Sequence, residues 1–126
     1  MLAVCQELRI GSKLVPRIAT GFGGGIGRTG AVCGAVIGGT MAIGLRHGRE
    51  KASRPSDRAY ALAQQFRRRF EDEMSTISCR ELTGVDLTTL EGLQRFRSSD
   101  LPKTVCRRAR GVAFRAVMQI LDEHRG

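Results

Sequence analysis

The sequence predicts an all-α fold: a small single-domain helical bundle with a glycine-rich loop before the central helix. The chain has 126 residues, and compact domains usually run to about 100–150 residues. Apolar residues recur at the 3.6-residue spacing of amphipathic helices, and no segment shows the strict alternation of a strand. We therefore treat residues 1–126 as one helical domain.

The amino-terminal part predicts two short helices. Residues 1–8 have the apolar spacing of a helix that stops near Gly11, and we interpret residues 1–11 as the remnant of a longer first helix. Ser12 has the side chain of an N-cap, so it predicts a second short helix that ends at about Thr20.

Glycine is concentrated in one part of the chain. Eleven of the sixteen glycines lie between Gly21 and Gly48. Residues 21–30 predict a loop, and residues 30–47 predict the central helix, which Gly48 would end. The loop contains a G-x-G-x-x-G pattern, but no strand precedes it, so nucleotide binding is only a minor alternative. We expect these glycines to let the backbone approach a helix or a ligand closely.

The second half predicts further helices. Residues 56–74 carry the clearest apolar stripe, and residues 78–81 fit a capping box that opens a short helix. Residues 85–101 are mixed, with about one helical turn, and a last helix should run from about residue 104 to 123. The apolar face of this last helix should bury Val105, Ala109, Val112, Ala113, Ala116, Val117, Ile120 and Leu121.

Three of the four cysteines lie near expected helix starts: Cys33, Cys79 and Cys106. The unpaired N–H groups and dipole at a helix amino terminus stabilise thiolates and other anions. A single free cysteine usually fills a small apolar hole, and we assign that role to Cys5. The other three together predict a thiolate site, provided that they meet in space.

Arginines next to these cysteines favour the same interpretation. Arg80 follows Cys79, and Arg107 and Arg108 follow Cys106. Neighbouring guanidinium groups lower a thiol pKa and favour a nucleophile or a metal ligand. No C-x-x-C occurs, so neither a thioredoxin-type redox pair nor a zinc ribbon is supported.

Other features limit the function classes. Residues 1–6 lack the basic and apolar regions of a secretory signal, so we expect a cytoplasmic protein with reduced thiols. The longest uncharged run, residues 29–45, is shorter than the usual membrane span and contains several glycines. No catalytic constellation can be argued from the remaining residues. The net charge of +9 would fit nucleic-acid binding, but the aromatic side chains that stack on bases are few.

Three segments resemble one known family. They read ATGFGGGIGRTGAVCGAVIGGTMAIGL, ISCRELTGVDL and KTVC, and they cover the chain from about Val15 to the last helix. This pattern resembles the C-GCAxxG-C-C family of redox-active proteins. The resemblance implies a small helical domain with four characteristic cysteines. Some members of the family are fused to haem-binding regions, and their cysteines are thought to hold an iron–sulfur cluster.

Matched to this family pattern, Cys33, Cys79 and Cys106 occupy three of the four cysteine positions. The first position falls upstream of Met1, about two helical turns before Cys5, so we expect the chain to begin late or to lack this ligand. Three cysteines would leave a four-thiolate site incomplete.

Taken together, the residues and the resemblance predict a redox-active protein. We expect Cys33, Cys79 and Cys106 to bind an iron–sulfur cluster or another thiophilic metal for electron transfer or redox sensing. The expected supporting residues, for close packing or for thiolate charge, are Gly34, Gly38, Arg80, Arg107 and Arg108.

Two alternatives stay open. The chain could be a metal-free thiol redox protein, or a basic module that binds an acidic partner or nucleic acid. A redox partner protein or a second copy of the chain is the kind of partner that we expect, whereas nucleic acid and membranes are not expected.

Overall fold

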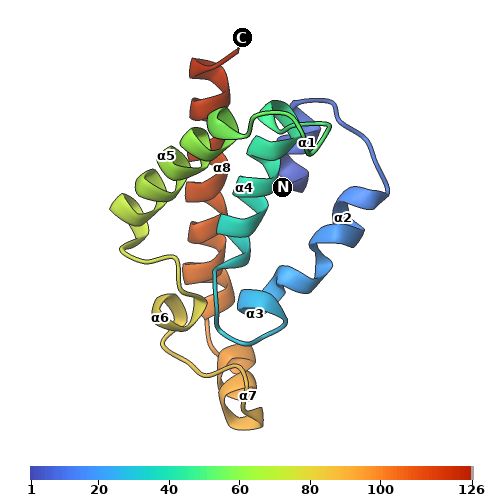
Figure 1. Ribbon diagram of the computed structural model, residues 1–126. Coiled ribbons are helices and arrows are strands. Elements are labelled where there is room, and N and C mark those ends of the chain that lie inside the picture. Colours follow the sequence, from blue (N-terminus) through green and yellow to red (C-terminus); the bar gives the residue numbers. More distant parts are fainter. Residues whose placement is uncertain (126) are drawn as a thin grey trace.

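Three long helices form the body of the molecule, and they confirm the predicted all-α fold. The computed structural model describes residues 1–125. Helices α4 (Gly34–His47), α5 (Asp57–Met74) and α8 (Arg107–Glu123) pack against one another (Figure 1). Their apolar faces form the main core, whose largest fully buried side chains are Phe66, Phe70, Ile43, Ile120, Val112 and Val117.

The amino-terminal elements lie along one side of this body. Helix α1 (Leu2–Glu7) contacts α8, and it buries Val4 and Cys5. Helix α2 (Leu14–Ala19) buries only Val15 and lies further out (Figure 1). It leads through the 3₁₀ turn η1 (Thr20–Phe22) into α3 (Gly23–Ile26), which ends close to the start of α4.

Shorter elements close one end of the body. These are α6 (Cys79–Thr83), α7 (Leu90–Ser98) and the π-helical turn η2 (Pro102–Cys106), which continues directly into α8. Thr89 caps α7 by accepting a hydrogen bond from the Gly92 N–H at 3.0 Å. A second, smaller apolar cluster forms at this end, made of Cys79, Val85 and Leu87 with the partly buried Leu93, Phe96 and Leu101.

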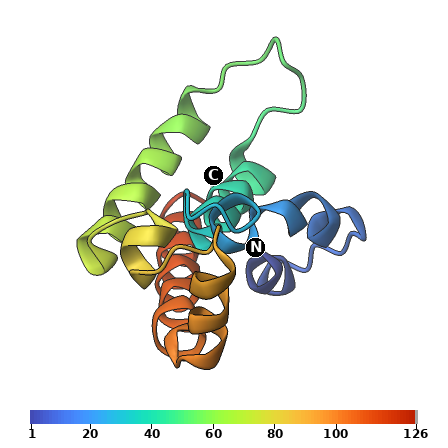
Figure 2. The ribbon, with the colours of Figure 1, turned by 90° about the horizontal axis from the view of Figure 1, so that it is seen from below.

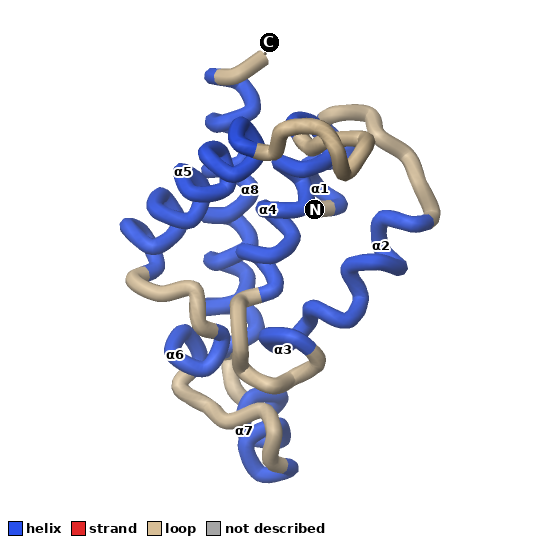
Figure 3. The backbone as a smooth tube through the Cα atoms, in the orientation of Figure 1, coloured by secondary structure: helices blue, strands red, loops and turns tan. Residues whose placement is uncertain are grey.

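Helices and loops account for the secondary structure of residues 1–125 (Figure 3). Extended pairing in this part of the chain is limited to one antiparallel bridge between Val32 and Ser78. The connector between α4 and α5, residues 48–56, projects away from the body (Figure 2). None of the helices within residues 1–125 is long and apolar enough to cross a membrane.

Two predicted helix boundaries were wrong. The central helix begins at Gly34 instead of Gly30, because the residues before Gly34 pair with the segment that leads into α6. The last helix, expected from about residue 104, is divided into the π-helical turn η2, which begins at Pro102, and α8, which begins at Arg107. A proline is tolerated in the first turn, because its missing N–H needs no partner there. Val105, which lies in that turn, is only partly buried.

Gly39 carries a testable consequence for the core. A Cβ at this position would overlap the ring of Phe66, whereas a Cβ at Gly44 on the same helix would have open space around it. We expect Gly39→Ala to lower the free energy of unfolding by about 1–3 kcal/mol through overpacking. Gly44→Ala should raise it by up to about 1 kcal/mol, because alanine is the better helix former. Urea denaturation of both variants measures the difference, and equal effects would contradict the close α4–α5 packing.

Candidate thiol site

Paired backbone segments place Cys33 next to Cys79. The segment before α4 runs antiparallel to the segment before α6. The Cys33 N–H donates to the carbonyl of Ile77 at 2.7 Å, and the Cys79 N–H donates to the carbonyl of Ala31 at 2.7 Å. The main chain of each cysteine is therefore held by a hydrogen bond to the other segment. Cys33 is the N-cap of α4, and Cys79 is the first residue of α6.

The start of α6 is capped as the sequence predicts. The Ser78 hydroxyl accepts a hydrogen bond from the Glu81 N–H at 3.2 Å. The Glu81 carboxylate accepts one from the Thr76 hydroxyl at 2.5 Å, and the Ser78 N–H donates to that same hydroxyl at 3.1 Å. This network fixes the turn from which Cys79 projects.

The third cysteine comes from the π-helical turn. Cys106 is the last residue of η2, and the Arg107 N–H closes this turn by donating to the carbonyl of Pro102. Cys106 therefore lies inside a continuous helix rather than in the free first turn of one. This placement differs from the predicted one, and it removes the helix terminus as a source of thiolate stabilisation at Cys106.

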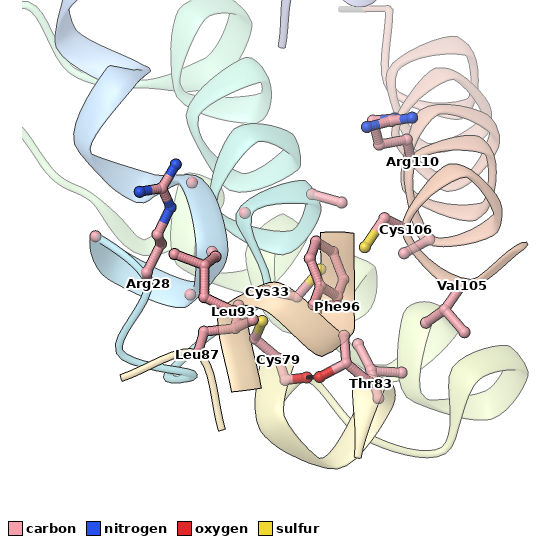
Figure 4. Close-up of a pocket in the computed structure, with 18 of the residues that line it drawn as sticks. Arg28, Cys33, Cys79, Thr83, Leu87, Leu93, Phe96, Val105, Cys106 and Arg110 are labelled. Atoms are coloured by element: carbon pink, nitrogen blue, oxygen red, sulfur yellow. Dashed lines mark hydrogen bonds between the residues drawn. The ribbon is translucent and has the colours of Figure 1, made fainter. Parts of the chain in front are cut away.

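All three of these cysteines line one cavity of about 620 Å³ (Figure 4). The loop of α3 lies on one side of the close-up and α8 on the other, with Leu93 and Phe96 of α7 between them. Cys5 does not belong to this group, because it is 3% exposed in the core beside α8. The structure thus brings together the three cysteines that the sequence singled out.

The glycine-rich loop forms a wall of the cavity through left-handed backbone. Residues Gly24 and Gly25 have φ angles of 67° and 68°, and Ile26, Gly27 and Arg28 continue the left-handed run. A side chain at Gly25 would place its Cβ 2.7 Å from the Cβ of Cys79. Glycine is thus required here both by backbone conformation and by the approach of Cys79.

The close packing expected of Gly34 and Gly38 around the thiols occurs at the thiol cavity only for Gly34. A Cβ on Gly34 would lie 3.2 Å from the carbonyl oxygen of Phe22, and one on Gly38 would lie 3.2 Å from the Met1 nitrogen. Gly34 is part of the cavity lining, whereas Gly38 lines the neighbouring cavity that also borders α1.

Burial controls the charge state of two of the thiols. It raises the pKa of Cys79 above the usual 9.0, and the charges of Cys33 and Cys106 raise it further. Burial also raises the pKa of Cys106, as does Cys33, while Arg110 works in the opposite direction. The low thiol pKa inferred from neighbouring arginines does not hold for Cys79 and Cys106, because burial raises both pKa values and a cation, Arg110, opposes it only at Cys106.

The arginines that line the cavity differ from those that the sequence singled out. Arg80 is largely exposed and lies 3.7 Å from the carboxylate of Asp86. Arg108 donates to the carbonyl of Glu73 at 3.5 Å, and Arg107 points to solvent. None of these three is among the residues of the described chain that line the cavity, which instead include Arg28, Arg97 and Arg110.

These cavity arginines left only a partial sequence signal. Arg110 lies four residues after Cys106, so the two share a helix face, and that spacing could have identified it. Arg28 and Arg97 reach the cavity through the left-handed loop and through the packing of α7, which no local pattern reveals.

The geometry limits which metal centre would fit. Within residues 1–125, no three His, Cys, Asp or Glu side chains are close enough together to hold one metal ion. The three thiols instead share the lining of one cavity. The role of Cys33, Cys79 and Cys106 as ligands stays a prediction.

A family model matches residues 1–120, almost the whole chain, and its description reads "Putative redox-active protein (C_GCAxxG_C_C)". The chain belongs to the C_GCAxxG_C_C family. This confirms the resemblance drawn from the cysteine and glycine motifs, and it indicates redox activity as the general function. Neither a curated protein nor a solved structure shows a significant match to the chain.

The raised thiol pKa values give a pH-dependent prediction. The folded chain holds Cys79 and Cys106 protonated to higher pH than the unfolded chain does. We therefore expect their alkylation by iodoacetamide to reach half its limiting rate at a pH above 9.0, the usual thiol value. Peptide mass spectrometry, with the urea-unfolded chain as reference, measures this midpoint. A midpoint at or below that of the unfolded chain would contradict the dominance of burial.

A pair of glycine variants tests how the loop positions Cys79. Gly25 and Gly84 both have left-handed φ angles, of 68° and 70°, but a Cβ at Gly84 meets nothing within 4 Å. Gly84→Ala should lose about 1 kcal/mol to backbone strain. Gly25→Ala should lose more, because its Cβ would also lie 2.7 Å from the Ala31 nitrogen. Only Gly25→Ala should also displace Cys79 and change its alkylation rate severalfold. If Gly84→Ala changes that rate equally, the contact between Gly25 and Cys79 does not position the thiol.

Proposed function

We propose that this chain is a redox protein that binds an iron–sulfur cluster, or another polynuclear thiophilic metal centre, on Cys33, Cys79 and Cys106. The observation that supports this proposal best is that three cysteines far apart in the sequence line a single cavity of about 620 Å³. Thiolate sulfur is the ligand that iron–sulfur clusters use in proteins. The group, when bound, would supply one-electron transfer for electron transport or redox sensing.

The spacing of the thiols favours a cluster over a single ion. A tetrahedral zinc ion needs its sulfur ligands about 2.3 Å from one centre, and no set of three ligands within residues 1–125 meets such a requirement. A cluster carries its metal atoms on separate corners, so each cysteine can bind a different one. The cavity between the thiols provides room for the body of such a group.

The charges of the lining favour the same group. Bound thiolates carry negative charge into a half-buried site, and that charge needs compensation. Arg28, Arg97 and Arg110 line the cavity, and no Asp or Glu of the described chain does. These guanidinium groups would offset the charge of the thiolates and of the cluster sulfides. Their number and placement also influence the reduction potential through local charge and solvent access.

The pKa shifts favour a metal-bound thiolate over free-thiol chemistry. Burial raises the pKa of Cys79 and Cys106, so the metal-free thiols stay protonated at neutral pH. A free thiol in that state is a poor nucleophile. A metal ion, in contrast, removes the proton when it binds the sulfur. Metal loading should therefore release protons and become stronger as the pH rises.

Anaerobic reconstitution with iron and sulfide tests this proposal. We expect a brown protein with visible absorption and with several iron and sulfide equivalents per chain. Cys33→Ala, Cys79→Ala and Cys106→Ala should each lose most of the bound iron, because each removes one of only three thiolate ligands.

Cys5→Ala is the matched control, because it also removes one cysteine but lies outside the cavity. It should keep the iron content of the unmodified chain, at some cost in stability from the lost packing. A colourless, iron-free protein after reconstitution would overturn the proposal. So would equal loss of iron in Cys5→Ala and the three cavity variants.

A further inference from the structure

We infer that the thiol cavity is also a binding site for a small organic anion, one whose carboxylate or phosphate group contacts Arg110, with Arg28 and Arg97 adding positive charge. The anion site rests on the proposed function only in that both use the same cavity. The observation behind it is a cavity whose charged lining residues are all cations.

The three arginines come from three separate parts of the fold. Arg28 lies in the left-handed loop after α3, Arg97 lies near the end of α7, and Arg110 lies in the first turns of α8. Arg28 and Arg110 lie on opposite sides of the cavity in the close-up, with the cysteines between them (Figure 4). The fold thus gathers positive charge around the thiols from elements that are distant in sequence.

These arginines lack the partners that the other arginines near the site have. Arg80 has Asp86 at 3.7 Å, and Arg108 donates to the carbonyl of Glu73. Within residues 1–125, neither Arg28, Arg97 nor Arg110 forms an ion pair or a side-chain hydrogen bond. Their guanidinium donors are therefore available to a ligand, and the fork of N–H groups matches carboxylate and phosphate oxygens.

Arg110 lies one helical turn after Cys106, and both residues line the cavity. A concave site with one sign of charge raises the local concentration of oppositely charged ligands. An anion at Arg110 would therefore lie within reach of Cys106.

A neighbouring cavity gives the body of such an anion room. This second cavity, of about 380 Å³, also has Arg110 in its lining and shares Thr20, Gly34 and Ala35 with the first. Most of its remaining lining is apolar, including Leu2, Val4 and Phe114. Arg110 thus lies where a charged group could meet the thiols while an uncharged part extends away from them.

The charge of a thiol reagent tests this inference without any metal. Iodoacetate and iodoacetamide both alkylate a thiolate with loss of iodide, but only iodoacetate is an anion. The full-length chain is used with its thiols reduced and metal removed by a chelator. In the folded chain, the rate ratio of iodoacetate to iodoacetamide at Cys106 should exceed that of the unfolded chain by roughly threefold to tenfold. Raising the salt concentration should reduce this excess.

Variants of α8 assign the effect to one side chain. Arg110→Gln should lower the ratio at Cys106 at least threefold, and Arg110→Lys should retain most of it because the charge remains. Arg115→Gln is the matched control, because it removes the same charge from an exposed residue of the same helix outside both cavities. Equal ratios in the folded and unfolded chains, or equal losses in Arg110→Gln and Arg115→Gln, would overturn the inference.

Protection experiments then identify the anion class. Succinate or inorganic phosphate, at constant ionic strength maintained with chloride, should slow iodoacetamide labelling of Cys106 at least twofold in the unmodified chain and not in Arg110→Gln. The stronger protector distinguishes a carboxylate site from a phosphate site, and no protection by either would count against the inference. Iron and sulfide content after reconstitution is measured separately. Protection of Cys106 by an anion without any bound cluster would refute the proposed function and leave the anion site supported.

Discussion

The antiparallel pairing of the segments that precede α4 and α6 is the constraint on which the thiol site depends. Two backbone bonds of 2.7 Å, from Cys33 to Ile77 and from Cys79 to Ala31, fix the two cysteines on either side of the bridge between Val32 and Ser78. Everything else at the site is arranged around it: the left-handed glycine turn packs against Cys79, and the π-helical turn brings Cys106 to the same cavity. The long helices also form part of the site, since α4 and α8 contribute Ala35 and Ala109 to the cavity lining and Ala109 belongs to the main core.

The helical core could be predicted because its signal is local. The apolar stripe of α5 and seven of the eight residues expected to be buried in the last helix follow directly from 3.6-residue spacing. The starts of the central and last helices were predicted less well. In the first case a pairing with residues 77–80 displaces the boundary, and in the second the chain enters the helix through a wider turn. Both depend on contacts or geometry that lie outside any local window.

The residues of the site also divide into those with a local sequence signal and those without one. The cysteines were found because each carries a local signal and because the family pattern supports it. The arginines of the cavity were not found, because adjacency in sequence does not place two side chains at the same site. Arg80 and Arg107 directly follow cysteines, yet neither is among the residues that line the cavity. Neighbouring residues on a helix project about 100° apart, so the residue after a buried cysteine normally faces solvent. The pKa values of Cys79 and Cys106 are therefore raised by burial and not lowered by the arginines that follow these cysteines in the sequence.

The π-helical turn is the last part of the link between α7 and α8. It contains five residues, Pro102–Cys106, where a regular helix would complete its turn with fewer. Deleting one of them would shorten the link between Ser98 and Arg107 and would pull α7 toward the start of α8. Phe96 and Arg97 of α7 would then shift in the cavity wall relative to Cys106. Changes in chain length should therefore be tolerated in the projecting connector at residues 48–56 and not in this turn.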